Sequence, residues 1–253
     1  MRYVVDTTDK RNLYVYNLLL KNRYSVIKLG EAEGLNAEDT VVFAPGKKLS
    51  AQDMCDLASG CTLLCGNVNA EVAEIIKAKN IKYINIMEDE IFAVKNANLT
   101  AEGVLAILLE ESPRSMFKNN ILVIGGGRIA LACAKLFNGL SLNFAMVSYN
   151  PVKFPRYYID TQNCYFKTAF LKDLDKFDVI VNTIPNQIFD EETIKLIPQN
   201  CLYIETASVP SLDANLATQF NYLLAPALPG KYCFETAGEL LYEMIIGENN
   251  YEN

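Results

Sequence analysis

Short runs rich in β-branched and aromatic residues alternate with segments of helical spacing, and this alternation restricts the fold more than any other feature. Between the runs, apolar residues recur at helical spacing, as at Leu13, Tyr16 and Leu20. Such alternation predicts a parallel sheet with helices on both faces, and five strands fit a flavodoxin-like domain. The first series of strand-like runs comprises residues 3–6, 24–29, 40–44, 62–65 and 83–86.

A single helical segment then interrupts the alternation. The pattern predicts a helix over 98–112, capped by Asn98 or Thr100 and ended by Pro113, with a polar linker behind it. A second series of strand-like runs follows, at 121–124, 144–148, 164–166, 179–182, 202–205 and 222–225, with helices at 129–137 and 235–246.

These patterns predict an α/β protein of two domains. The expected organisation is an N-terminal flavodoxin-like parallel sheet over 1–97, a connecting helix and linker over 98–118, a doubly wound Rossmann fold over 119–232, and a C-terminal helix over 233–253 that packs back on the first domain.

Composition excludes several classes of function. A net charge of −7 argues against a nucleic-acid binder, and no apolar stretch approaches the ~20 residues of a membrane span, so we expect a soluble cytoplasmic protein. Seven cysteines without a C-x-x-C pair predict reduced thiols and no metal site. The chain has no histidine, which excludes Ser-His-Asp and Cys-His hydrolases and histidine-based hydroxy-acid dehydrogenases.

The strongest local signal is the segment 121–130, which reads ILVIGGGRIA. Gly125 permits a tight turn after a buried strand, and Gly127 lets the backbone approach a pyrophosphate. Arg128 and Ile129 open the helix whose free N–H groups would hold the phosphates. The segment predicts a bound nicotinamide dinucleotide; the alternative is a structural glycine turn that has lost its cofactor.

The end of the next strand indicates which dinucleotide is bound. It reads Ser148, Tyr149 and Asn150, without the carboxylate that usually holds the ribose of NAD, and Lys153 and Arg156 follow. We therefore expect NADP, although both cations could equally be ordinary loop charges.

Two further strand ends carry small polar groups where a nicotinamide would lie. The first ends near Thr183 and Pro185, and the second near Glu205 and Ala207. Glu205 is a candidate general base, or alternatively a brace for a neighbouring loop.

Several segments resemble the family of dipicolinate synthase A subunits. The specific ones are 181–185 (VNTIP) and 225–230 (APALPG) followed by 236–238 (TAG). The segments 9–13, 96–103, 121–130 and 205–208 also resemble that family.

The resemblance implies the two-domain fold of hydroxy-acid dehydrogenases. It further implies NADP-dependent oxidation of dihydrodipicolinate, a small dicarboxylate, to dipicolinate during sporulation, together with a flavoprotein partner, the B subunit of the synthase. In that architecture Arg11, Asn12 and Thr100 approach the substrate, and Arg11 anchors a carboxylate. Asp9 is a second candidate base, Lys47 and Lys48 are weaker anchors, and Pro226, Leu228 and Gly230 line the nicotinamide side.

Departures from the family pattern keep other functions open. The turn has Ala130 where the family usually has a third glycine, and the segments after Ser208 and over 231–234 differ. The alternatives are an NAD(P)-dependent dehydrogenase of another small carboxylate and a non-catalytic subunit that binds a dinucleotide or a partner protein. Assembly into a homo-oligomer stays open.

Overall fold

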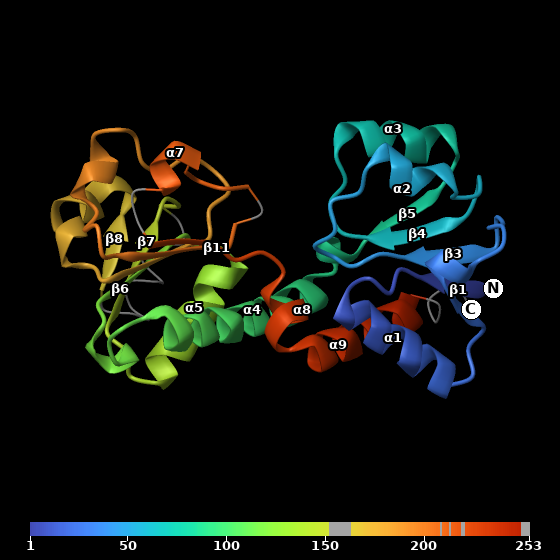
Figure 1. Ribbon diagram of the computed structural model, residues 1–253, viewed down its shortest axis with the longest axis horizontal. Coiled ribbons are helices and arrows are strands. Elements are labelled where there is room, and N and C mark those ends of the chain that lie inside the picture. The colour runs from blue at the N-terminus through green and yellow to red at the C-terminus, as the bar shows by residue number, and fades with distance from the viewer. Residues whose placement is uncertain (152–162, 208, 213, 219–220, 249–253) are drawn as a thin grey trace. The chain divides into compact units, whose positions relative to one another are not determined.

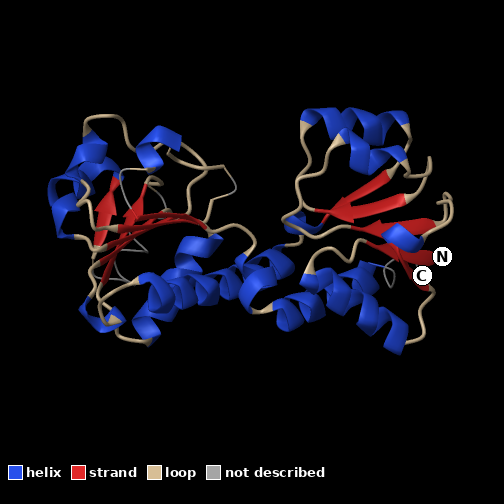
Figure 2. Ribbon diagram, in the orientation of Figure 1, coloured by secondary structure: helices blue, strands red, loops and turns tan. Residues whose placement is uncertain are grey.

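The computed structural model describes residues 1–151, 163–207, 209–212, 214–218 and 221–248 (Figure 1). These form two compact units: unit 1 comprises residues 1–96 and the segment from Pro229 onward, and unit 2 comprises 97–228. Each contains one sheet covered by helices (Figure 2). The division into four segments, at 1–97, 98–118, 119–232 and 233–253, stays a prediction.

Unit 1 is built on a five-stranded parallel sheet of order β2-β1-β3-β4-β5, which is the flavodoxin order and confirms the predicted fold of this part. The strands are β1 (Arg2–Val5), β2 (Val26–Lys28), β3 (Asp39–Val42), β4 (Thr62–Cys65) and β5 (Lys82–Asn85). The helices are α1 (Lys10–Lys21), α2 (Ala51–Cys55), α3 (Ala70–Ala78), α8 (Leu228–Tyr232), whose first residue belongs to unit 2, and α9 (Phe234–Glu248), with 3-10 turns at Leu29–Glu31 and Ile86–Glu88.

Helices cover both faces of this sheet. Met54 of α2 and Val72 of α3 belong to the core on one face, and Val15 of α1 and Leu241 of α9 to the core on the other. Helices α1 and α9 approach closely because Gly238 has no side chain: a Cβ there would lie 2.9 Å from the Arg11 carbonyl oxygen. The TAG segment is thus explained by helix packing.

Unit 2 is built on a six-stranded parallel sheet of order β11-β10-β9-β6-β7-β8, the doubly wound Rossmann order predicted from the sequence. The strands are β6 (Ile121–Ile124), β7 (Phe144–Ser148), β8 (Cys164–Phe166), β9 (Val179–Asn182), β10 (Leu202–Glu205) and β11 (Asn221–Leu224). The helices are α4 (Glu90–Glu111), which begins in unit 1, α5 (Arg128–Gly139) and α7 (Ala214–Ala217), with 3-10 segments at Met116–Lys118, Lys167–Lys176 and Thr193–Leu196.

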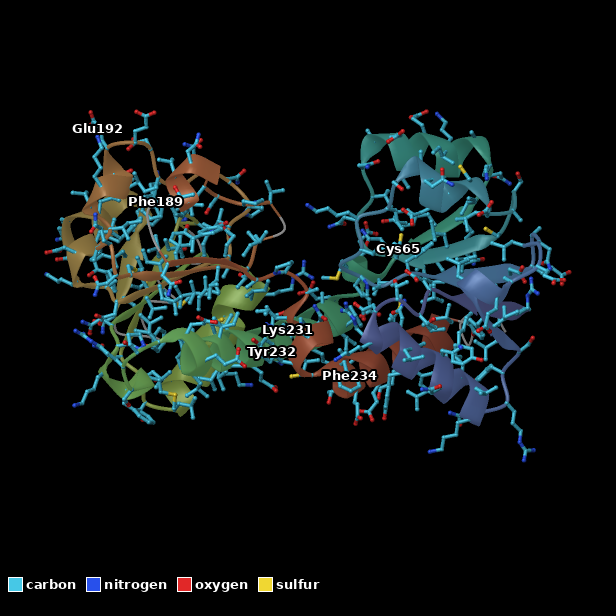
Figure 3. All side chains as sticks on the ribbon, viewed as in Figure 1. Cys65, Phe189, Glu192, Lys231, Tyr232 and Phe234 are labelled. Atoms are coloured by element: carbon cyan, nitrogen blue, oxygen red, sulfur yellow. The ribbon has the colours of Figure 1, made fainter. Side chains whose placement is uncertain are left out.

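Aromatic rings fill the core on one face of this second sheet. Phe189 is labelled in Figure 3. The centre of its ring lies 6.0 Å from that of Phe170 and 6.3 Å from that of Tyr203, and both pairs are edge-on. The strand order reverses between β6 and β9, and in this fold ligands bind at the carboxyl ends of the strands there.

The predicted start of the connecting helix is wrong. Helix α4 begins at Glu90, where the Asp89 carboxylate accepts a hydrogen bond from the Phe92 N–H at 2.8 Å and caps the helix. Asn98 and Thr100 lie inside the helix, because its apolar pattern continues upstream through buried Phe92. Within the described residues, α4 is the one helix long and apolar enough to cross a membrane by length and composition, and 56% of its apolar window is buried inside the protein.

Candidate functional site

The glycine turn after β6 needs a glycine at its first position. Gly125 has a φ of +136°, a conformation that residues with a side chain rarely adopt. A Cβ there would lie 2.0 Å from the Thr183 hydroxyl, which donates to the Ile124 carbonyl at 2.9 Å. Thr183 therefore fixes the turn from the neighbouring strand end.

The start of α5 has open space beside its first backbone N–H groups. Gly127 is the N-cap residue and supplies no capping side chain, and a Cβ there would meet nothing within 4 Å. Arg128 is exposed and Ile129 half-buried in the first turn. Backbone N–H groups at a helix start, beside a residue without a side chain, are the arrangement that binds pyrophosphate. The structure thus brings Gly125, Gly127, Arg128, Ile129 and Thr183 together.

The carboxyl end of β7 lacks an acidic residue. Ser148 is fully buried. Its hydroxyl donates to the Asn150 carbonyl at 3.4 Å and accepts from the Asn150 N–H at 3.3 Å, so Ser148 stabilises the turn. Tyr149 and Asn150 are exposed at this end. Lys153 and Arg156, on which the NADP expectation partly depends, lie outside the described residues.

Glu205 is held in a buried network rather than directed toward solvent. Its carboxylate accepts hydrogen bonds from Asn182 Nδ2 (2.9 Å), Ala207 N (3.1 Å), Ser211 N (2.9 Å) and Ser211 Oγ (2.5 Å). The residue is 0% exposed. These contacts tie the ends of β9 and β10 to the following loops, which favours the bracing role over the catalytic one.

The same strand ends carry hydrogen bonds that extend the network. The Asn182 side chain also donates to the Ile184 carbonyl through Nδ2 and accepts from the Ile184 N–H through Oδ1. The Thr206 hydroxyl donates to the Asn182 backbone carbonyl at 2.8 Å. Pro185 is exposed and Ala207 buried. The Tyr203 hydroxyl lies 2.9 Å from Ser211 Oγ, and burial raises the pKa of Tyr203 far above its usual value.

The segment predicted to line the nicotinamide side falls into both units. Pro226 is exposed, whereas Leu228 is buried against α4, where a Cβ on Gly103 would lie only 2.7 Å from the Leu228 Cβ. Gly230 belongs to unit 1, where a Cβ would lie 3.2 Å from Arg11 Nη2 and 3.2 Å from Asp9 Oδ2. The structure places Gly230 against the predicted substrate residues.

Asp9 and Arg11 form a pair at the carboxyl end of β1. Asp9 caps α1 by accepting from the Arg11 N–H at 2.9 Å, and its two oxygens accept from Arg11 Nε (3.3 Å) and Nη2 (3.1 Å). Burial raises the pKa of Asp9, but the hydrogen bonds and charge of Arg11 outweigh burial and lower it. Arg11 is only 2% exposed. Its guanidinium, which we expected to anchor a carboxylate of the substrate, already binds the carboxylate of Asp9.

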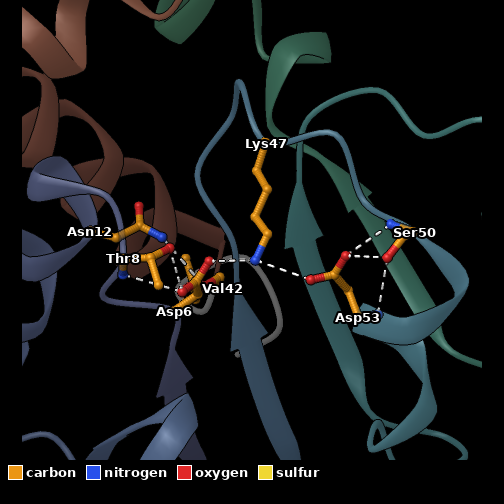
Figure 4. Close-up of polar contacts among 7 residues, drawn as sticks. All are labelled: Asp6, Thr8, Asn12, Val42, Lys47, Ser50 and Asp53. Atoms are coloured by element: carbon orange, nitrogen blue, oxygen red, sulfur yellow. Dashed lines mark hydrogen bonds and ion pairs between the residues drawn. The ribbon is translucent and has the colours of Figure 1, made fainter.

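A second ion cluster at this edge was not foreseen from the sequence. Lys47 Nζ lies 2.9 Å from Asp6 Oδ2 and 3.1 Å from Asp53 Oδ1 (Figure 4). It also lies 4.6 Å from the centre of the Phe43 ring. Burial lowers the pKa of Lys47, but the two aspartates outweigh it and raise that pKa. Asp6 follows β1 directly, and that position at a strand end is the signal that could have identified it.

The remaining predicted substrate residues are both buried. Asn12 lies beside Asp6 in Figure 4, and Thr100 is buried on α4, in unit 2. In the described part of the chain, no group of three or more His, Cys, Asp or Glu is placed to hold a metal ion. All seven cysteines are free.

Comparison with known proteins shows which proteins this chain resembles. No protein-family model matches the sequence. The chain is 26% identical to the A subunit of dipicolinate synthase of Bacillus subtilis (strain 168) over 216 residues, which covers 81% of this chain and 71% of that protein. The crystal structure of the dipicolinate synthase A subunit from Bacillus halodurans superposes with a TM-score of 0.85, at 20% identity, over 97% of this chain and 96% of that one.

A dehydrogenase shares the same architecture. The apo structure of D-lactate dehydrogenase from Escherichia coli superposes with a TM-score of 0.65, at 12% identity, over 100% of this chain and 97% of that one. The doubly wound sheet with its glycine turn defines a protein with the fold of dinucleotide-binding dehydrogenases. Within that class, the resemblance to the A subunit of dipicolinate synthase that the sequence predicted is confirmed.

Proposed function

We propose that the protein is an NADP-dependent oxidoreductase that oxidises dihydrodipicolinate to dipicolinate, in the cytoplasm of a sporulating cell and together with the flavoprotein B subunit of the synthase. The relative that it resembles is named as one subunit of a synthase, which supports a partner. The observation that carries the proposal is the open space at Gly127, directly at the start of α5.

The residues present fit a dinucleotide. Gly125, Gly127, Arg128 and Ile129 would hold the pyrophosphate, and Ser148, Tyr149 and Asn150 the adenosine ribose, where the missing carboxylate favours a 2′-phosphate. Thr183, Pro185, Ala207, Pro226 and Leu228 would lie on the nicotinamide side. The bound cofactor would accept the hydride released as the substrate ring becomes aromatic.

The protein itself would orient the substrate. Arg11, Asn12 and Thr100 remain our proposed substrate residues, with Gly230 beside Arg11. Orientation of the reacting carbon is a large part of what such an enzyme must provide, because the cofactor carries out the redox step.

Gly127→Ala tests the cofactor site, with Gly139→Ala at the other end of α5 as the matched control. A Cβ meets nothing within 4 Å at either glycine, so both variants should fold with unchanged stability. Only the first places a methyl group where the pyrophosphate would lie. We expect the Kd for NADPH to rise about tenfold or more in Gly127→Ala, which is about 1.4 kcal/mol, and to stay unchanged in Gly139→Ala.

Calorimetric titration of wild-type protein with NADPH and with NADH completes the test. Tighter binding of NADPH supports the proposed role of Ser148–Asn150, and a preference for NADH would refute that role alone. Flat titrations with both, or equal affinities in the two glycine variants, would refute the dinucleotide site.

A second candidate function is that of a dinucleotide-binding subunit without catalytic activity. The observation that favours it is that both predicted bases, Glu205 and Asp9, are hydrogen-bonded within the protein. NADPH formation from dihydrodipicolinate, by this chain alone or with a flavoprotein partner, would exclude this alternative. Turnover of a different small carboxylate would instead identify a dehydrogenase with another substrate.

A further inference from the structure

A cavity of about 370 Å³ lies in unit 2, at the amino ends of β6, β7 and β8. Ligand pockets in proteins measure about 300–1,000 Å³, so a small molecule fits this one. The proposed dinucleotide site lies at the carboxyl ends of the same parallel strands, and therefore at the opposite edge of the sheet. The lining of the cavity includes Asn120, Asn143, Asn163, Tyr165, Lys176 and Phe177.

The three asparagines of this lining each directly precede a strand. Asn120 precedes β6, Asn143 precedes β7 and Asn163 precedes β8. The parallel register brings the first two together, because the Ile121 N–H donates to the Asn143 carbonyl at 3.0 Å. Their side chains are linked as well: Asn143 Nδ2 donates to Asn120 Oδ1 at 2.5 Å, and Asn120 Nδ2 donates to the Lys176 carbonyl at 2.9 Å.

The Lys176 carbonyl fixes the orientation of both amides. A backbone carbonyl only accepts, so Asn120 turns its Nδ2 toward Lys176 and its Oδ1 toward Asn143, which must then supply its own Nδ2. Asn143 is exposed, and no residue in the described part of the chain donates to its Oδ1. This oxygen and the second Nδ2 hydrogen therefore form an open amide edge, with an acceptor beside a donor.

Aromatic rings and paired charges complete the lining. The ring centres of Tyr165 and Phe177 lie 6.4 Å apart in an edge-on arrangement. Lys176 forms an ion pair with Asp173, whose carboxylate also accepts from the Tyr165 hydroxyl at 3.1 Å. An anion would have to compete with Asp173 for Lys176, whereas a flat neutral ring can stack on an aromatic side chain without displacing any group. The cavity thus favours a planar, uncharged ring.

An open asparagine amide beside aromatic rings matches the chemistry of adenine. Asparagine pairs with this base through two hydrogen bonds, in which Oδ1 accepts from the 6-amino group and Nδ2 donates to N7. We propose that the cavity is a second ligand site, which binds the adenine ring of a nucleoside or nucleotide through Asn143. The inference does not depend on the proposed function, because the dinucleotide site lies at the other edge of the sheet.

A tryptophan in the lining reports binding at this place, because the chain contains no tryptophan. Phe177→Trp keeps an aromatic ring in the cavity, and Tyr24→Trp, at an exposed position of unit 1, is the matched control. We expect adenosine to quench the fluorescence of Phe177→Trp in a saturable manner, with a Kd of about 1 mM or tighter. Tyr24→Trp should show no saturable change.

Inosine separates hydrogen bonding from stacking, because it carries an oxygen acceptor in place of the 6-amino donor. In calorimetric titrations, the full-length wild-type protein should bind adenosine about three- to tenfold more tightly than inosine, the effect of one net hydrogen bond. Titration with AMP distinguishes the two sources of the ring, and both of its outcomes support the site. Tighter binding of AMP than of adenosine indicates a nucleotide, and otherwise the ligand is a nucleoside.

Asn143→Leu removes the amide at nearly constant volume, and Asn138→Leu, at an exposed position of α5, is the control. The preference for adenosine over inosine should fall to within about twofold in the first variant and persist in the second. NADPH affinity should stay unchanged in both. Should Asn143→Leu not fold, Asn143→Ala, which also removes the amide, should give the same result.

Adenosine that leaves the fluorescence of Phe177→Trp unchanged, equal binding of adenosine and inosine to the wild type, or a preference that survives loss of the Asn143 amide would each overturn the inference. Should Phe177→Trp not fold, the wild-type and Asn143 titrations decide alone. NADPH titrations of the same samples keep the two proposals apart. Normal NADPH binding without adenosine binding refutes the cavity site alone, whereas a flat NADPH titration with adenosine binding intact refutes the dinucleotide site alone.

Discussion

The variant Glu205→Gln tests whether the Glu205 carboxylate stabilises the loops after β9 and β10 or acts as a general base. Glutamine has nearly the same shape, but one oxygen becomes an NH₂ group that donates hydrogen bonds and cannot accept them. In the folded protein, Glu205 Oε1 accepts from Asn182 Nδ2 and Ala207 N, and Oε2 accepts from Ser211 N, Ser211 Oγ and, at 3.2 Å, also from Asn182 Nδ2. Either orientation of the new amide therefore places a donor against at least one buried N–H.

The size of the effect follows from these contacts. With NH₂ at the Oε2 position, the Ser211 hydroxyl can turn to accept, but the Ser211 N–H loses its acceptor. With NH₂ at the Oε1 position, the Ala207 N–H loses its acceptor, whereas Asn182 Nδ2 keeps Oε2 and the Ile184 carbonyl. One buried donor left without a partner costs about 1–3 kcal/mol, so we expect the free energy of unfolding to fall by about 2 kcal/mol.

Urea unfolding at pH 7 measures this loss. Glu192→Gln is the matched control, because Glu192 is an exposed residue of the same unit (Figure 3) and should change stability by less than about 0.5 kcal/mol. Turnover and NADPH affinity are measured in parallel. A bracing role predicts lost stability together with weaker NADPH binding, since the network holds the loops after β9 and β10.

Unchanged stability in Glu205→Gln, within about 0.5 kcal/mol of wild type, would refute the bracing role. Lost turnover at unchanged stability and NADPH affinity would restore Glu205 as a general base.

Two further predictions concern the glycine turn and the Asp9–Arg11 pair. Gly125→Ala places a Cβ 2.0 Å from Thr183 Oγ1 at a φ of +136°, so we expect the free energy of unfolding to fall by about 1–3 kcal/mol or more, measured by urea unfolding; a neutral result would contradict the turn geometry. The pKa of Asp9 is lowered in the folded protein, so its ionised form stabilises the fold above its unfolded pKa of about 3.9 and this contribution is lost as pH falls through the folded value. Unfolding of Asp9→Asn should therefore depend less on pH below about pH 4 than wild type, and equal slopes would contradict the pairing.

The fold was predictable because the spacing of apolar residues and the order of strands and helices can be recognised directly in the sequence. The strands Ile121–Ile124, Phe144–Ser148 and Val179–Asn182 occur where their apolar runs predicted them. The start of α4 was not predictable in this way. Asp89 and Asn98 have equally good capping chemistry, and only burial of the intervening apolar residues decides between them.

The site was only partly predictable, for a different physical reason. Gly125 and Gly127 act through backbone geometry, which a strand–turn–helix pattern specifies. The role of a charged side chain depends instead on its partners, which come from distant parts of the chain: Asp6 and Lys47 are 41 residues apart. Strand ends identify such residues as polar and close to a ligand edge, but they do not show which charges are already paired.

The paired charges also bear on what chemistry the protein supplies. The chain has no histidine, and Glu205 and Asp9 each accept hydrogen bonds from within the protein. A general base would have to break those bonds before it could take a proton, which raises the barrier to its use. In the proposed reaction, formation of an aromatic ring makes loss of the proton favourable, so water could take it. The protein would then contribute the orientation of the substrate and the geometry of hydride transfer.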